Sequence, residues 1–211
     1  MRVIKISTNN PIIGHYLAQL RDVERQQNIA LFRRIVYKLG TFLAYESSKE
    51  LDYQSKPIKT PFSDTHIDCL MDNPIMYAII RAGIKLQEGV NAVFEDSLCG
   101  FCSCKKDNQG IRHAELYTTC DTANRIVYIC DPIAASGSSI IETIRAIDVN
   151  GKPSKIIILN IITTPLAIEN IQKALDDNIV VYTCAIDHFT KGIRGTLPGL
   201  GDVGDLLYGK R

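Results

Sequence analysis

Small and hydroxyl-bearing residues follow an acidic residue near the middle of the chain. The apolar stretch from Ile126 to Cys130 leads into Asp131, and the loop from Asp131 to Ser139 leads into an isoleucine-rich segment. Small residues let a backbone curl around an anion, and amides at the start of a following helix point toward it. The serine hydroxyls add donors, whereas the Asp131 carboxylate repels phosphate and can accept hydrogen bonds from sugar hydroxyls. The pattern predicts a site for a ribose 5-phosphate.

The same loop has a plainer interpretation, an ordinary turn between a strand and a helix whose serines cap the helix. It matches neither the G-x-x-x-x-G-K-[ST] pattern of P-loop nucleotidases nor the G-x-G-x-x-G pattern of dinucleotide-binding folds. Those two classes are therefore disfavoured.

Two more segments carry residues suited to phosphate or base recognition. Arg81 follows the apolar run Ile75 to Ile80, and its planar guanidinium could grip phosphate oxygens, although a surface arginine closing a strand is common. The segment from Leu197 to Gly209 is rich in glycine and contains Asp202 and Asp205. Glycine permits positive φ and close backbone approach to a flat ligand, and a glycine-rich surface loop is the alternative.

The elements that must position these residues alternate between strand and helix. Strands are expected at 126–130, 155–162 and 179–186, with helices at 139–150 and 165–177 between them. Such β-α-β units predict a parallel β-sheet flanked by helices, whose ligands bind beyond the carboxyl ends of the strands. We expect one domain over 1–211, built from N-terminal helices (1–51), an irregular arm or small hairpin (52–74), an α/β core (75–186) and a base-binding segment (187–211).

Composition excludes several other classes of protein. The 211 residues are 45% hydrophobic and 22% charged with a net charge of +1, so no global positive field favours nucleic acid. The apolar runs are far shorter than the roughly 20 residues that span a bilayer. The seven cysteines follow no secretory signal, so reduced thiols and a cytoplasmic location are expected. Cys99, Cys102 and Cys104 lack further ligands at zinc spacing and are interpreted as core or strand thiols.

Four segments together resemble one enzyme family. Asp131-Pro132 followed by Ser136-Gly137 resembles the signature of type I phosphoribosyltransferases, and the Asp-Pro pair is typical of the uracil phosphoribosyltransferase branch. The segment P-G-L-G-D-V-G-D from Pro198 resembles the C-terminal hallmark of that branch. The sequences I-I-R-A-G at 79–83 and F-L-A-Y-E at 42–46 are similar to its I-L-R-A-G and L-L-T-Y-E. Ser136, Ser138, Gly195 and Lys106 depart from the family's Thr, Gly, Tyr and Arg.

This resemblance implies a type I phosphoribosyltransferase fold with a hood formed by the N- and C-terminal segments. It implies a pentosyltransferase that joins uracil to 5-phosphoribosyl 1-diphosphate (PRPP), giving uridine monophosphate (UMP) and pyrophosphate in pyrimidine salvage. Catalytic roles would fall on Asp131, Asp202 and Arg81. The PRPP site would comprise Arg81, Lys106, Asp131, Pro132, Ile133, Ala134, Ala135, Ser136, Gly137, Ser138, Ser139 and Asp202. Uracil would be read by Thr196, Gly201, Asp202 and Val203.

The resemblance also implies partners. Mg²⁺ would be held largely by PRPP, with Asp202 as the protein ligand. A homodimer or higher homo-oligomer is expected, and guanosine triphosphate activates some relatives; no nucleic acid or membrane partner is expected. Two alternatives remain at this stage: a phosphoribosyltransferase for another base, and a non-catalytic regulator that binds PRPP or nucleotide.

Overall fold

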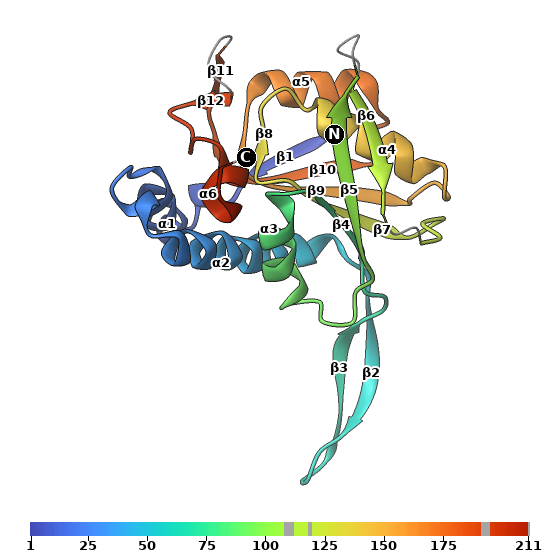
Figure 1. Ribbon diagram of the computed structural model, residues 1–211. Coiled ribbons are helices and arrows are strands. Elements are labelled where there is room, and N and C mark those ends of the chain that lie inside the picture. Colours follow the sequence, from blue (N-terminus) through green and yellow to red (C-terminus); the bar gives the residue numbers. More distant parts are fainter. Residues whose placement is uncertain (108–111, 118–119, 191–194, 211) are drawn as a thin grey trace.

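A mostly parallel sheet forms the centre of the fold (Figure 1). The computed structural model describes residues 1–107, 112–117, 120–190 and 195–210, apart from the side chain of Lys106. The strand order is β1-β10-β9-β7-β4-β5-β6, with β8 beside β9. These strands are β1 (Arg2–Lys5), β4 (Ile75–Ile79), β5 (Cys99–Lys106), β6 (Arg112–Leu116), β7 (Ile126–Cys130), β8 (Ile133–Ala134), β9 (Lys155–Thr163) and β10 (Ile179–Ile186). Among the described pairings of this sheet, β5 with β6 alone is antiparallel.

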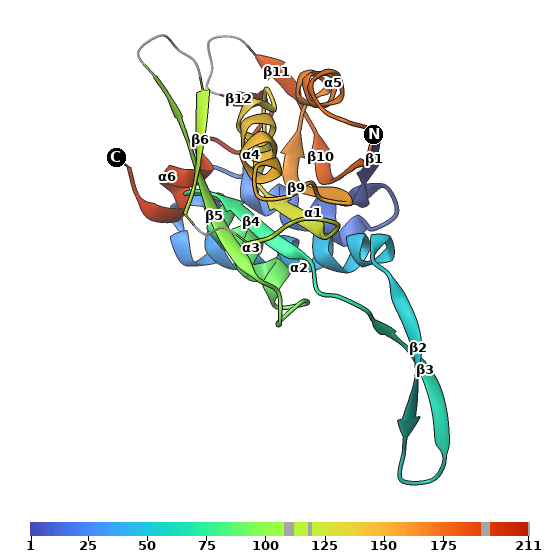
Figure 2. The same ribbon diagram turned by 90° about the vertical axis from the view of Figure 1, so that its right-hand side faces the viewer.

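Helices cover both faces of the sheet, as Figures 1 and 2 show from two directions. The helices are α1 (Pro11–Arg21), α2 (Ile29–Ser47), α3 (Gly83–Asn91), α4 (Ser138–Asp148), α5 (Pro165–Ala174) and α6 (Val203–Tyr208). Short 3₁₀ helices lie at Ile6–Thr8, Arg25–Gln27 and Ser48–Glu50. Helices α1, α2 and α3 cover one face, and α4 and α5 cover the other.

Alternation along the central strands produces the two cores. Tyr128 and Cys130 of β7 pack with α2 and α3, whereas Val127 and Ile129 pack with α4 and α5. Successive side chains of a strand point to opposite faces, so a strand covered on both faces must be apolar throughout. This requirement explains the continuous apolar runs that predicted the sheet.

Glycine lets the helices α2 and α3 touch backbone to backbone. A Cβ added at Gly40 would lie 2.5 Å from the carbonyl oxygen of Leu86, and one added at Gly89 would collide with the carbonyl of Tyr37. Helix α3 begins immediately after the loop that carries Arg81. The close contact therefore holds that loop against the N-terminal helical layer.

The arm expected at 52–74 is an extended hairpin that projects from the body (Figures 1 and 2). Its strands β2 (Tyr53–Lys59) and β3 (Asp64–Leu70) pair antiparallel, and most of their residues are exposed. Phe62 at the tip is 98% exposed. Of the two forms expected for this segment, the hairpin is the one present.

The predicted hood is present at the junction of the two ends of the chain. It consists of α1 together with the described residues of 187–210, including the short strands β11 (His188–Thr190) and β12 (Gly195–Leu197). Arg21 binds both carboxylate oxygens of Asp187 at 2.8 Å and the carbonyl of Gly199 at 3.0 Å. Gln26 and Arg33 donate to the carbonyls of Leu200 and Leu207. These bonds fix the C-terminal segment on the N-terminal helices.

The predicted strands and helices lie where the sequence indicates, with several helices ending earlier than expected. Helix α2 ends at Ser47, α4 at Asp148 and α5 at Ala174. The N-terminal segment is not wholly helical, because Arg2–Lys5 forms the edge strand β1 beside β10. No described helix has both the length and the apolar character that crossing a membrane requires.

Candidate active site

A cleft of about 650 Å³ opens at the carboxyl ends of β4 and β7. It brings together Arg81, Asp131 and Asp202, which the sequence analysis selected from three separate segments. Its lining comprises Ile79, Ile80, Arg81, Ala82, Cys104, Arg112, Asp131, Ile133, Ser139, Asp202, Gly204 and Asp205. The position agrees with the rule that ligands of open parallel sheets bind beyond the strand ends.

The loop after β7 forms a smaller hollow of about 130 Å³ beside the cleft. Gly137 takes φ +75° just before α4, a conformation that favours glycine. Thr164 Oγ1 donates to the carbonyl of Ala135 at 2.6 Å, and Asn170 Nδ2 donates to that of Ser136 at 3.0 Å. These two carbonyls are therefore bound to α5 and its N-cap. The start of α4 lines the hollow, and the amides at a helix start can bind an anion.

The remaining loop residues divide between the hollow and the sheet. Ile133, Ala134, Ala135, Ser136, Gly137, Ser138 and Ser139 all line the hollow. The carbonyl of Pro132 instead accepts from the amides of Ile161 and Ile162 at 3.0 and 2.9 Å. Pro132 therefore anchors the loop to β9 and lines neither cavity.

Asp131 is half-buried where the cleft meets the hollow. Desolvation raises the pKa of its carboxyl to about 7, and the hydrogen bond from the Ile133 amide at 3.4 Å only partly opposes this rise. The charge of Arg112 also lowers this pKa, and that of Cys104 raises it. A carboxyl with this pKa is close to half-ionised at neutral pH, so a bound hydroxyl or cation would favour its charged form.

Arg81 is held by the C-terminal segment. Its Nη2 lies 2.6 Å from Asp205 Oδ1, and its Nη1 donates to the carbonyl of Gly209 at 3.1 Å. A Cβ at Gly204 would lie 3.2 Å from the same Nη2, so glycine leaves room for the guanidinium. Asp205 was part of a motif in the sequence analysis, but its pairing with Arg81 was not foreseen.

Asp202 caps the N-terminus of α6 and also lines the cleft. Its Oδ1 accepts from the Asp205 amide at 3.1 Å, and the residue is exposed. Of the four residues expected to read uracil, Asp202 is the one in the cleft lining. Thr196 is buried in β12, Val203 packs into the core under α2, and Gly201 is exposed at φ +80°.

The hairpin β5–β6 forms one wall of the cleft. Lys106, expected to meet the diphosphate, ends β5 opposite Arg112, but its side chain lies outside the described part of the structure. Arg112 lines both the cleft and the smaller hollow, and sequence reasoning missed it. The signal was present in the alternation of R-H-A-E-L, whose first, third and fifth residues are half-buried.

Cys99, Cys102 and Cys104 all lie on strand β5. All seven cysteines are free, and Cys102 and Cys104 lie on β5 with their sulfurs near the Thr143 hydroxyl, at 3.2 and 3.5 Å. The described residues contain no group of three or more His, Cys, Asp or Glu side chains arranged to hold a metal ion. A cation in the cleft would therefore depend on oxygens of its ligand as well as on a carboxylate such as Asp202.

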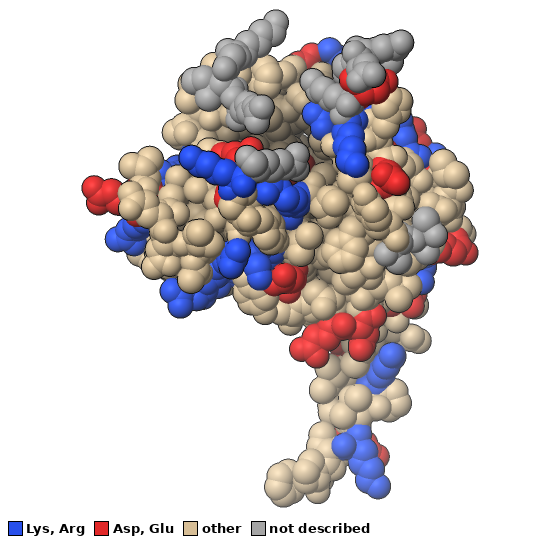
Figure 3. All heavy atoms as spheres, viewed as in Figure 1, with Lys and Arg blue, Asp and Glu red and all other residues tan. Residues whose placement is uncertain are grey.

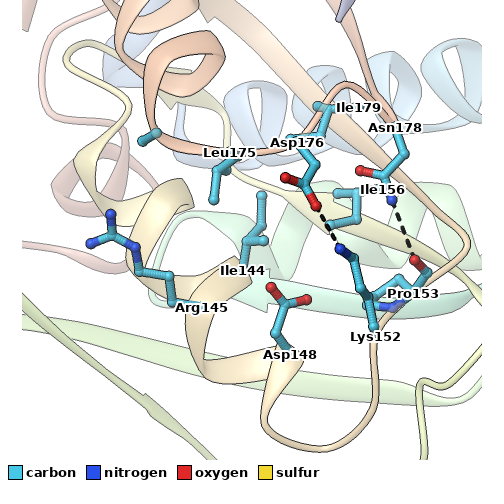
Figure 4. Close-up of a pocket in the computed structure, with 11 residues that line it drawn as sticks. Ile144, Arg145, Asp148, Lys152, Pro153, Ile156, Leu175, Asp176, Asn178 and Ile179 are labelled. Carbon is cyan, nitrogen blue, oxygen red and sulfur yellow. Dashed lines mark hydrogen bonds and ion pairs between the residues drawn. The ribbon is translucent and has the colours of Figure 1, made fainter.

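Charged side chains also lie outside this cleft. A hollow of about 200 Å³ between the C-terminal ends of α4 and α5 contains charged residues, but Lys152 and Asp176 pair with each other at 2.6 Å (Figure 4). On the face shown in Figure 3, basic side chains are most numerous around α1 and α2, and acidic side chains lie among them and near the base of the arm.

Comparison with known proteins gives one consistent result. The family model for uracil phosphoribosyltransferase matches residues 7–210. A uracil phosphoribosyltransferase of Porphyromonas gingivalis is 30% identical, with 100% of both chains covered. One from Thermococcus kodakarensis is 31% identical over 96% of this chain and 89% of its own. Among solved structures, the AQ2163 protein from Aquifex aeolicus has a TM-score of 0.85 at 24% identity, with 98% of each chain covered, and so shares the fold.

Proposed function

The chain belongs to the uracil phosphoribosyltransferase family, which joins uracil to PRPP with release of pyrophosphate, and from this we propose how its cleft performs the reaction. The proposal rests on one observation above all: Arg81, Asp131 and Asp202 come from distant segments and line one cleft. In the family reaction uracil N1 attacks the anomeric carbon of PRPP while the diphosphate departs. The protein must therefore hold the sugar phosphate, the diphosphate and the flat base so that uracil N1, the anomeric carbon and the departing diphosphate lie in one line.

The sugar phosphate is assigned to the loop from Asp131 to Ser139. The 5-phosphate lies in the smaller hollow, against the start of α4, where backbone amides and serine hydroxyls donate to it. The Asp131 carboxylate accepts hydrogen bonds from the ribose hydroxyls at the edge of the hollow. Because Pro132, Thr164 and Asn170 fix the loop, it holds the sugar without rearranging, and the anomeric carbon is presented in a constant position.

The departing diphosphate is assigned to the side of the cleft that carries Arg81. Its guanidinium is already oriented by Asp205 and Gly209, so little reorganisation is needed when charge develops on the leaving group. Lys106 would add a second cation from β5. Asp202, an exposed carboxylate on the cleft wall, would hold a magnesium ion together with oxygens of PRPP, and such an ion would supply positive charge for the leaving group.

Uracil is assigned to the segment that begins at Thr196. Its alternating carbonyl and N–H groups suit main-chain donors and acceptors, which Gly201 and the neighbouring Asp202 and Val203 supply. The side chain of Val203 is in the core, so this residue contributes its backbone alone. Asp187 and Arg21 keep the whole segment in place.

The first experiment is conversion of radiolabelled uracil to UMP with PRPP and magnesium. Asp202→Asn and Arg81→Gln should each lower kcat/KM at least tenfold, because each removes a charge that faces the diphosphate or its ion. Asp176→Asn and Arg145→Gln are matched controls, since both residues line the separate hollow of Figure 4. Equal losses in controls and site variants would reject the proposed site, and preference for another base in competition would reassign the substrate.

We also propose self-association and a cytoplasmic location. An apolar groove of about 450 Å³ lies between α1 and α2, where Ile12 and Tyr45 are 50% and 66% exposed. The exposed Phe62 at the tip of the arm offers a second apolar contact, and two copies related by a twofold axis would cover both surfaces. Sedimentation of wild type and Phe62→Ser tests the dimer. The free state of all seven cysteines supports a reducing compartment.

A further inference from the structure

Arg112 occupies a position that none of the matched motifs includes. It begins β6, where the pairing of Lys106 with Arg112 and of Cys104 with Ala114 fixes the register against β5. Alternate residues of β6 are half-buried, and Leu116 at the far end packs into the core under α4. Side chains two apart on a strand share a face, so Arg112 points inward over α4 and not toward solvent.

The guanidinium of Arg112 has an unsatisfied donor. Its Nε is buried and has no hydrogen-bond partner among the described residues. Buried donors in folded proteins are nearly always bonded, and one left alone costs more when the group is charged. Such a donor beside a cavity indicates an acceptor that arrives with a ligand.

The cavity beside Arg112 is suited to an anion and contains no other described cation. Apart from Arg112, the smaller hollow is lined by Asp131, apolar and small residues, and the serines at the start of α4. Arg81, by contrast, lines only the larger cleft and is paired with Asp205. The volume of about 130 Å³ admits a phosphate group, whose bulk is that of a few water molecules at about 30 Å³ each.

We infer that Arg112 binds the 5-phosphate of PRPP and of the nucleotide product, closing the hollow opposite the start of α4. This inference rests on the proposed function, which assigns the 5-phosphate to the loop from Asp131 to Ser139. The loop and the start of α4 supply neutral donors on one side of the hollow, and Arg112 supplies a positive charge from β6. A guanidinium presents several N–H groups in one plane, so two of them can bind phosphate oxygens together.

The location of Arg112 also separates its role from that of Arg81. A 5-phosphate is present in PRPP and in UMP, whereas the diphosphate is present in PRPP and in free pyrophosphate. Loss of Arg112 must therefore weaken UMP more than pyrophosphate, and loss of Arg81 must do the opposite. This reciprocal pattern is not expected from a general disturbance of the fold.

The test is titration calorimetry of UMP and of magnesium pyrophosphate against wild type, Arg112→Gln, Arg112→Lys and Arg81→Gln. Arg112→Gln should weaken UMP at least tenfold, the loss expected for one charge-assisted hydrogen bond, while pyrophosphate changes less than twofold. Arg112→Lys should fall between, because lysine keeps the charge but loses the planar geometry. Arg145→Gln, the same substitution at the exposed Arg145 on α4, is the control and should match wild type.

Three results would overturn the inference: unchanged UMP binding in Arg112→Gln, equal weakening of both ligands, or a larger loss of pyrophosphate than of UMP. Thermal unfolding of each variant separates these results from misfolding, and Arg112→Lys provides a second reading if the glutamine variant is unstable. Failure of the proposed function would give a different result, because the wild type itself would then bind neither UMP nor pyrophosphate.

Discussion

Replacing Asp131 by Asn should stabilise the protein while it impairs the enzyme. Burial raises the pKa of the Asp131 carboxyl from 3.8 to about 7, so the folded protein resists ionisation of this group. Asn keeps the shape and cannot ionise. The variant therefore removes a cost that the wild type carries only when the carboxyl is charged.

The size and pH window of the effect follow from the two pKa values. Between about pH 4 and pH 7 the folded state keeps a proton that the unfolded state has lost, so the free energy of unfolding of the wild type falls as pH rises. Three pKa units at 1.36 kcal/mol each give about 4 kcal/mol when the window has been crossed. Because Asp131 is half-buried, we expect a change of about 2–4 kcal/mol.

Urea unfolding of wild type and Asp131→Asn at several pH values between 4 and 8 measures this effect. The stability of the variant relative to wild type should rise through the window and level off above pH 7. Asp176→Asn is the control, because an ion pair with Lys152 lowers the pKa of that exposed carboxyl and no such gain is expected. A difference between Asp131→Asn and wild type that does not change with pH would refute the reasoning.

The activity of the same variant provides an independent reading. Asn offers one acceptor oxygen in place of two and no negative charge, so kcat/KM for PRPP should fall at pH 8 even though the protein is more stable. A variant that is both more stable and fully active would show that Asp131 does not contact the sugar. Functional sites commonly contain groups that lower stability in this way.

Two other predictions concern how the site is held. Asp187→Ala removes three hydrogen bonds of 2.8 Å, to Arg21 and Gly199. It should lower the free energy of unfolding by about 2–4 kcal/mol, somewhat less than the roughly 3–5 kcal/mol of a fully buried pair, because Arg21 is partly exposed. Urea unfolding measures this loss of stability. Initial rates should show that KM rises more for uracil than for PRPP, and an equal rise in both KM values would contradict the anchoring role. Gly83→Ala places a Cβ against the backbone carbonyl of Cys130 and should cost about 1–3 kcal/mol and reduce kcat through the neighbouring Arg81, whereas Gly14→Ala, with open space around it, should not destabilise the fold. Thermal unfolding of both variants would reveal the opposite order if the close packing at Gly83 were unimportant.

The central part of the fold could be predicted because burial on both faces leaves a direct trace in sequence. The strands β4 and β7 are apolar at every position, and β9 is apolar apart from Lys155, Asn160 and Thr163. The residues that follow these strands include Arg81, Asp131 and Thr164. The position of the loop between β7 and α4 was equally readable, since small residues that follow an apolar run and precede a helix are typical of such a turn. These features are local, so neighbouring residues carry the information.

Features that depend on pairing between segments could not be predicted. The strand β1 is short, mixed in polarity and half exposed, and its identity comes from pairing with β10. The inward direction of Arg112 depends on the register of β6 against β5, where a slip of one residue would turn it outward. The ion pair of Arg81 with Asp205 likewise joins residues 124 positions apart. Such contacts have no signature within either segment alone.

The contacts that close the hood join the most distant parts of the chain, and this has a consequence for the order of folding. Gln26 and Arg33 each bind a carbonyl 174 residues away. Contacts of such span must overcome a large loop-closure entropy, so they form after the locally connected β-α-β units. A folding intermediate that has formed only the β-α-β units from β7 to β10 would already contain the loop from Asp131 to Ser139, but it would lack β1, Asp202 and the restraint on Arg81. We therefore expect recovery of activity to lag behind recovery of secondary structure when the protein refolds.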